Sequence, residues 1–163
     1  MTAPNTIKER AVAELRRPVD VEEYARIRKL WKEHSIAEDG RNIPGLLATL
    51  TEDCVYEVPA TGHRWEGHQG ARRFYETLLA AFPDATFDLE HIVIGPQGVY
   101  QEAVMSGTLT RDWIGVKAHG QKVAYRVLIL FPWDPVRRLF TGERVHFDEA
   151  TFARQAGMSI PRV

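Results

Sequence analysis

Residues 123–133 read VAYRVLILFPW, and this density of β-branched and aromatic side chains predicts a strand. Asp134-Pro135 predicts a turn, after which residues 139–147 return as a second strand. Further upstream, residues 86–94 alternate between apolar and polar side chains, and residues 99–113 form another long predicted strand. The C-terminal half of the chain is therefore predicted to be a meander of long antiparallel strands.

The N-terminal half carries helical periodicity instead. A helix is predicted over residues 20–40, because Asp20 has the position of an N-terminal cap and apolar residues recur along one face. Shorter helices are predicted at residues 43–50 and 69–82, with a strand at residues 54–58 between them. Helices followed by a meander predict an α+β fold. We expect a curved antiparallel sheet that encloses an apolar cavity with helices on its concave face.

Length and composition predict one domain over residues 20–163, preceded by an N-terminal extension over residues 1–19 in which residues 5–17 could form a short helix. Acidic and basic side chains nearly balance, 22 against 21, which argues against nucleic acid or an anionic membrane as a partner. No apolar run has membrane-spanning length, and the first ten residues lack the order of a secretory signal. A cytoplasmic location is expected.

The sequence contains no pattern typical of a metal site. Its single cysteine, Cys54, excludes an internal disulfide and a cysteine-based zinc cluster. No histidines or carboxylates have the spacing of metal ligands, and there is neither a phosphate-binding glycine loop nor a nucleophile elbow. We therefore expect a protein that uses no metal.

The last predicted strand ends in residues that could move protons. His146 and Asp148 lie two positions apart, so they share one face of a regular strand, and both residue types can act as acid or base. Val145 and Phe147 occupy the opposite face. If that apolar face lines the cavity, a bulge near the strand end is needed to turn Asp148 inward. Asp148 also directly precedes a predicted helix, where it would be a preferred cap, so both roles stay open.

Other candidate site residues come from the helices and the cavity strands. His34 lies one turn beyond Trp31 on the apolar stripe of the long helix. It is either a half-buried histidine stabilised by the helix dipole or a third catalytic residue that faces the pocket. The candidate substrate contacts are aromatic: Tyr24, Trp31, Tyr56, Trp65 and Trp113. The hydroxyl of Tyr56 could orient a substrate oxygen.

A homodimer is predicted through the outer face of the sheet. One alternating set of strand residues offers a second apolar surface that a single cone could not bury. This set includes Tyr100, Val104, Leu128 and Leu130.

Five short motifs occur together in this chain: LTEDCVYEVP at 50–59, WEGHQGA at 65–71, FPD at 82–84, GT at 107–108, and the ending from Asp148 to Gln155-Ala156-Gly157. Together they resemble the NTF2-like superfamily and, within it, the SnoaL-like polyketide cyclase and ester cyclase group. The resemblance covers about residues 22–158 and implies a conical α+β barrel that pairs as a dimer. It also implies an intramolecular aldol reaction without metal or organic cofactor, with Asp148 at the position of the group's acid/base.

Two other reactions of this fold family use different sets of residues. The Arg-x-Asp pair of limonene-type epoxide hydrolases is missing from residues 102–106, which read EAVMS. Scytalone-type dehydratases use two histidines, an aspartate and a tyrosine-bound water, and His34, His91, His146 and Asp148 could supply the charged groups. We therefore expect cofactor-independent cyclase or isomerase chemistry on an apolar, oxygenated small molecule. The alternatives are a dehydratase and a non-catalytic ligand-binding or dimerisation module.

Overall fold

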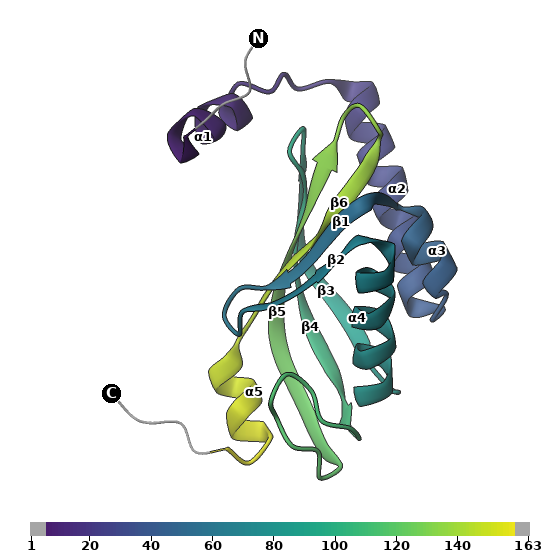
Figure 1. The fold of residues 1–163 in the computed structure, drawn as a ribbon, viewed down its shortest axis with the longest axis vertical. Coiled ribbons are helices and arrows are strands. Elements are labelled where there is room, and N and C mark those ends of the chain that lie inside the picture. Colours follow the sequence, from purple (N-terminus) through teal and green to yellow (C-terminus); the bar gives the residue numbers. More distant parts are fainter. Residues whose placement is uncertain (1–5, 159–163) are drawn as a thin grey trace.

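A strongly curved sheet of six strands organises the computed structural model, which describes residues 6–158 (Figure 1). The outer ends of the predicted extension and domain, residues 1–5 and 159–163, lie outside the described residues. The elements in chain order are α1 (Ile7–Leu15), α2 (Val21–Asp39), α3 (Ile43–Ala48), β1 (Leu50–Val58), β2 (His63–Glu66), α4 (Gly67–Ala81), β3 (Thr86–Gly95), β4 (Gly98–Leu109), β5 (Gln121–Asp134), β6 (Leu139–Phe147) and α5 (Glu149–Gln155). The predicted α+β class is confirmed.

The strands follow the order β2-β1-β6-β5-β4-β3, and the sheet does not close into a complete barrel. The predicted antiparallel meander is confirmed for β3 to β6, where β4 and β5 pair without interruption along the whole of β4. Two features differ from the prediction. The pair of β1 and β6 is parallel. Strand β2 lies between the predicted strand at 54–58 and the predicted helix at 69–82, where the sequence analysis places no strand.

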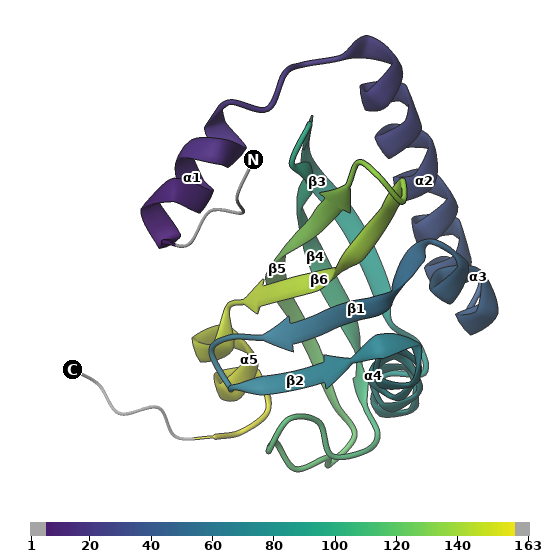
Figure 2. The ribbon, with the colours of Figure 1, turned by 45° about the horizontal axis from the view of Figure 1, so that its top comes forward.

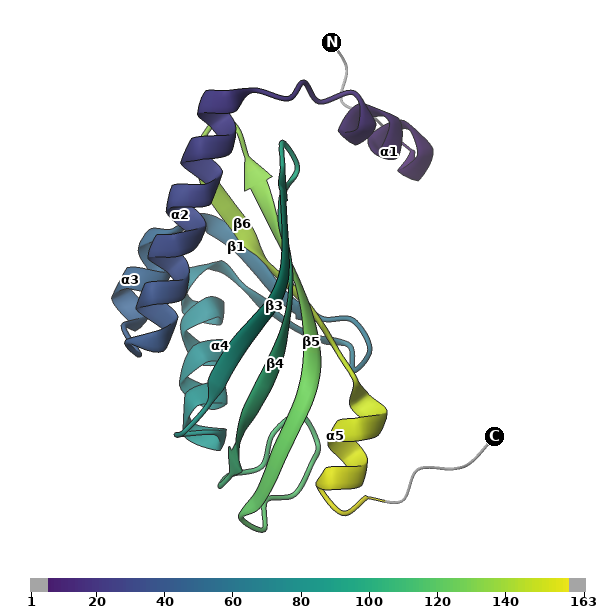
Figure 3. The same ribbon diagram turned by 180° about the vertical axis from the view of Figure 1, so that it is seen from behind.

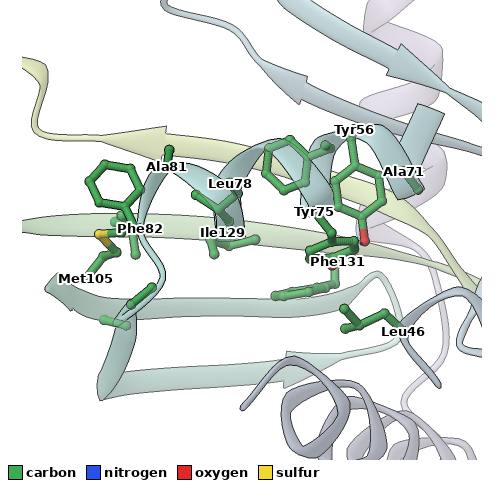
Figure 4. Close-up of a cluster of buried hydrophobic side chains, with 14 of the residues drawn as sticks. Leu46, Tyr56, Ala71, Tyr75, Leu78, Ala81, Phe82, Met105, Ile129 and Phe131 are labelled. Carbon is green, nitrogen blue, oxygen red and sulfur yellow. Dashed lines mark hydrogen bonds between the residues drawn. The ribbon is translucent and has the colours of Figure 1, made fainter. Parts of the chain in front are cut away.

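Helices α2, α3 and α4 cover the concave face of the sheet (Figures 1 and 3). The predicted cap of α2 is confirmed, because the Asp20 side chain accepts a hydrogen bond from the Glu23 backbone at 2.7 Å. Helix α4 turns one apolar stripe towards the sheet, and Figure 4 shows Ala71, Tyr75 and Leu78 of this stripe against the strands. The hydrophobic core therefore lies between these helices and the sheet.

The two terminal helices have different positions. Helix α1 buries no side chain and is joined to α2 by an extended segment (Figure 2). Its C-terminal end is tied to the turn between β3 and β4, where the Gln97 side chain donates to the carbonyl of Glu14 at 2.7 Å. Helix α5 lies beside the part of β5 that extends beyond β6, where the Gln155 side chain accepts from Ala124 N at 2.7 Å and donates to Ala124 O at 3.0 Å. Among the described residues, no helix combines the length and apolar character that a membrane crossing requires.

Strand β6 contains one residue more than the part of β5 that it faces. Leu130 pairs with Arg144, and Trp133 pairs with Phe140. Two residues of β5 therefore lie opposite three residues of β6, numbers 141–143. An insertion of this kind is a β-bulge, which bends the strand and shifts the alternation of its side chains.

The bulge depends on Gly142. This residue has a φ of 122°, which side-chain-bearing residues rarely adopt, and an added Cβ would overlap the backbone carbonyl of Val55 in β1. Beyond the bulge the strand alternates regularly again. As a result, Glu143, Val145 and Phe147 face the concave side of the sheet, and the residues between them face outward.

Candidate active site

A largely apolar cavity lies between the concave face of the sheet, helices α2 and α4, and the loop after β4. Its volume is about 480 Å³, including the part that is open to solvent. Most of the lining is aromatic or aliphatic: Val58, Phe74, Leu78, Phe87, Met105, Trp113, Ile114, Tyr125, Val127, Ile129, Val145 and Phe147. Two carboxyl groups complete it, Glu38 from α2 and Glu143 from β6. Among residues 6–158, no arginine, lysine or histidine lines the cavity.

Glu143 is the centre of a buried hydrogen-bond network. Its Oε1 accepts from the hydroxyl of Tyr75 at 2.5 Å and from the hydroxyl of Tyr56 at 2.9 Å. Nε2 of His34 lies 3.0 Å from the same oxygen. All four side chains are at most 3% exposed, so these bonds form away from bulk solvent, where they are stronger.

Thr49 fixes the proton arrangement of His34. Its hydroxyl donates to the backbone carbonyl of Leu46 at 2.7 Å, so it can only accept from Nδ1 of His34, also at 2.7 Å. Nδ1 therefore carries a proton, and Nε2 points at Glu143 and at the hydroxyl of Tyr75. Nε2 can therefore accept from the hydroxyl of Tyr75 when the ring is neutral and donate to Oε1 of Glu143 when the ring is protonated.

The two tyrosines remain hydrogen-bond donors. Burial, and then the charge of Glu143, raises the pKa of both Tyr56 and Tyr75 well above the usual value for a phenol. Their hydroxyls and His34 occupy Oε1 of Glu143. Among residues 6–158, no side chain or backbone group bonds to Oε2, so this oxygen is available to a molecule in the cavity.

The second carboxyl group of the cavity, Glu38, lacks the hydrogen-bond donors that surround Glu143. It follows His34 by one helical turn and is half-buried, and its carboxyl group has no hydrogen-bond or ion-pair partner in the described part of the chain. Burial raises its pKa to about 8, with further contributions from the charges of Glu143 and Asp39, while Arg41 lowers it. Glu38 is therefore mainly protonated at neutral pH.

Asp148 and His146 lie outside the cavity. Asp148 is exposed and caps α5, as one of the two predicted roles requires, and it accepts bonds from the backbone and hydroxyl of Thr151 at 2.9 and 2.7 Å. These bonds lower its pKa. His146 is exposed on the outer face, opposite Leu128. The bulge that could have turned Asp148 inward lies at Gly142 and turns Glu143 inward instead, so a catalytic Asp148 stays a prediction.

The third predicted catalytic residue, His34, is fully buried rather than half-buried, and it contacts Glu143 instead of lining the cavity. Because His91 and His146 are both exposed, the structure does not assemble the two-histidine arrangement considered for a dehydratase. Among residues 6–158, no three histidine, cysteine or acidic side chains are grouped to hold a metal ion.

The predicted aromatic contacts are divided between several environments. Trp113 lines the cavity, and Tyr56 belongs to the Glu143 network. Trp31 donates to a buried glutamine of β4 at 2.8 Å. Trp65 packs edge-to-face on a phenylalanine of α4, and Tyr24 is 45% exposed. Contact of these five residues with a substrate stays a prediction.

Sequence reasoning missed Glu38, Glu143 and Tyr75. A signal existed for both carboxylates. Glu143 has the same parity as the apolar Val145 and Phe147, so regular alternation places it on their face. Glu38 lies four residues after His34, which extends the helical stripe by one turn.

Comparisons with known proteins agree with this architecture. Residues 31–157 match the family model described as a SnoaL-like domain. No curated protein matches the chain in sequence.

Several solved structures share the fold. A candidate SnoaL-like polyketide cyclase from Shewanella denitrificans superposes with a TM-score of 0.71 at 14% identity, over 80% of this chain and 96% of that one. TsrD from Streptomyces laurentii gives 0.70 at 18% identity, over 87% and 100%. An NTF2-like protein of unknown function from Burkholderia pseudomallei gives 0.67 at 15% identity, over 80% and 97%. At these identities the likeness establishes the NTF2-like fold alone.

Proposed function

This chain belongs to the SnoaL-like family, and from that membership and the geometry of its cavity we propose an enzyme that moves a proton beside a carbonyl group. The observation that carries the proposal is that two carboxyl groups in opposite electrostatic environments, Glu38 and Glu143, line one apolar cavity. Such a pair provides an acid and a base at the same pH. The substrate class that fits this lining is an apolar, oxygenated small molecule. The chemistry is of the cyclase or isomerase kind and uses no cofactor.

Glu38 and Glu143 have complementary roles in this proposal. The protonated carboxyl of Glu38 donates a hydrogen bond to the substrate carbonyl oxygen and transfers its proton there. Oε2 of Glu143 takes a proton from the adjacent carbon. The electron pair of the broken C–H bond forms the carbon–carbon double bond of an enol. Where a carbon–carbon double bond is conjugated with the enol, Glu143 returns the proton at the far carbon of this dienol while the hydroxyl proton returns to Glu38, which gives an isomer. Where a second carbonyl is within reach, the enol carbon attacks it, the hydroxyl proton returns to Glu38 and the new alkoxide takes the proton held by Glu143, which closes a ring.

His34, Tyr56 and Tyr75 are positioning residues in this scheme. They do not line the cavity and act through Oε1 of Glu143, whose orientation and charge their hydrogen bonds fix. Preorganised donors of this kind need no rearrangement during the reaction.

The proposal is tested by α-proton exchange of acetophenone, a neutral aryl ketone, in D₂O, followed by NMR against a protein-free control. After subtraction of that control, the protein-dependent rate should fall by about tenfold per pH unit above pH 8, because Glu38 then loses its proton. A rate that keeps rising through pH 8 would contradict the role of Glu38 as the acid. No exchange above the control at any pH would favour the non-catalytic binding module.

We also propose that the protein is a homodimer through the outer face of the sheet. Tyr100 pairs with Val93 on one side and with Leu130 on the other, and Tyr100 and Val93 are 40% and 64% exposed. Ion pairs of Arg126 with Glu102 at 2.7 Å and with a glutamate of β3 at 2.9 Å border this apolar row.

Light scattering at micromolar concentration should therefore give about twice the chain mass of 18.6 kDa. Leu130→Arg should halve that value, because it places a charge in the apolar row. A wild-type mass of one chain would contradict the proposal.

A further inference from the structure

The loop after β4 contains a two-residue turn with an unusual residue in it. Trp113 and Val116 exchange backbone hydrogen bonds of 3.0 and 2.8 Å. Between them, Ile114 has a φ of 39° and Gly115 a φ of 85°. A turn with positive φ at both central positions strongly favours Asn-Gly. Isoleucine is unfavourable there, because its branched Cβ crowds the backbone in the left-handed region.

Ile114 differs from the other side-chain-bearing residues with positive φ in the described ranges, Arg41 and Arg138. Those two are unbranched and exposed. Ile114 is β-branched and half-buried, and it lines the cavity beside Trp113. Gly115, the next residue, has open space around it. The strained conformation therefore occurs at a position where the side chain reaches the candidate binding site.

Bonds on both sides of the turn hold it in place. Asp112 accepts from Lys117 Nζ at 2.5 Å and from Ala118 N at 3.1 Å. The Gln121 side chain donates to the carbonyl of Lys117 at 2.9 Å, and Gly120 N donates to a carbonyl at the end of β4 at 3.1 Å. A strained residue persists when its surroundings fix it in this way, and such residues concentrate at ligand sites.

We propose that Ile114 sets the upper size limit of the ligand. The turn holds its side chain against the loop end of the cavity, where the far end of a bound molecule would lie. Asn-Gly would form the same turn without strain but would place no apolar group over the cavity. The inference rests on the proposed function only in taking this cavity as the binding site.

The test combines three variants of Ile114 with a control from the same turn. Ile114→Ala shortens the side chain and keeps only the part of the strain that any Cβ causes in the left-handed region. Ile114→Gly removes the side chain and the strain, and Ile114→Asn relieves the strain at similar size. Val116→Gly is the control, because Val116 is buried but does not line the cavity. The ligands are phenyl alkyl ketones from acetophenone to hexanophenone. Their affinity is measured by quenching of tryptophan fluorescence, and melting temperatures are measured without ligand.

We expect Ile114→Ala and Ile114→Gly to bind ketones two carbons longer than the wild type accepts, with an affinity about tenfold higher for these ligands. The melting temperature of Ile114→Asn should equal or exceed that of Ile114→Ala. The melting temperature of Ile114→Gly should decrease less than that of Val116→Gly, each compared with the wild type. The control should keep the wild-type size limit. An unchanged limit in Ile114→Gly, or a loss of melting temperature as large as that of the control, would overturn the inference. A shifted limit without α-proton exchange in any protein would overturn the proposed chemistry and leave the role of Ile114 intact.

Discussion

Glu38→Gln should lower the rate of protein-dependent α-proton exchange by about two to four orders of magnitude at pH 7. Glutamine keeps the size of the side chain and can still donate a hydrogen bond to a carbonyl oxygen, but it has no acidic proton to transfer. Ketone binding, measured by tryptophan fluorescence, should change little because the cavity keeps its shape. The comparison of rate and affinity therefore separates proton transfer from substrate binding.

Asp148→Asn is the matched control for this experiment. Asp148 is exposed and its carboxyl group caps α5, and asparagine also accepts the capping hydrogen bond. We expect this variant to exchange α-protons at the wild-type rate. The reverse result, in which Asp148→Asn loses exchange and Glu38→Gln keeps it, would give the acid/base role to Asp148 and contradict the role of Glu38.

The same Glu38 variant should be more stable than the wild type at high pH. The Glu38 carboxyl titrates at its ordinary value of 4.5 when unfolded and at about 8 when folded. Between these values only the folded state retains the proton, so the free energy of unfolding of the wild type decreases as pH rises. The slope is at most about 1.4 kcal/mol per pH unit, and solvent around this half-buried group reduces it.

Urea denaturation at pH 5, 6.5 and 8 measures this effect. The stability difference between Glu38→Gln, which does not titrate, and the wild type should grow in favour of the variant as pH increases. A difference that is constant over this range would show that the Glu38 pKa is not raised in the folded protein.

Gly142→Ala should reduce the free energy of unfolding by about 3–5 kcal/mol, the range of severe backbone and packing defects. The added methyl group would overlap the backbone of Val55, and alanine does not readily adopt a φ of 122°. Because two main chains meet at this point, neither can move aside without breaking the pairing of β1 and β6.

Gly62→Ala separates backbone strain from the steric overlap. Gly62 has a φ of 73° and no atoms near the position of an added Cβ. Gly62→Ala should reduce the free energy of unfolding by about 1–2 kcal/mol, because alanine must adopt the left-handed conformation there. Equal losses in Gly142→Ala and Gly62→Ala, measured by urea denaturation, would contradict the expected overlap between Val55 and a methyl group at position 142.

Periodicity predicted the elements of this fold where many residues repeat one pattern. The stripe of α4 and the alternation of β5 extend over enough residues to define both the element and its buried face. Strand β2 was missed because it has four residues and lies at the edge of the sheet. Its pairing with β1 depends on a partner earlier in the chain, which a local pattern does not reveal.

The candidate site was harder to predict, because its residues come from distant segments. His34 and Glu143 are 109 positions apart in the sequence. The C-terminal motif predicted a catalytic carboxylate at Asp148, a residue that caps a helix. The alternation that includes Val145 and Phe147 indicated instead that Glu143 faces the cavity. The raised pKa of Glu38 depends on burial and on the charge of Glu143, neither of which the sequence of α2 contains.

The bulge at Gly142 also determines the sign of the charge inside the cavity. Phe140, before the bulge, faces the concave side of the sheet. If the strand continued from Phe140 without the bulge, Glu143 would face outward, and Arg144 and His146 would face the cavity. Arg144 and His146 would then place a guanidinium and an imidazole in the cavity, and these groups attract carboxylates and phosphates. One additional residue in one strand thus makes the difference between an interior that repels anions and one that would bind them.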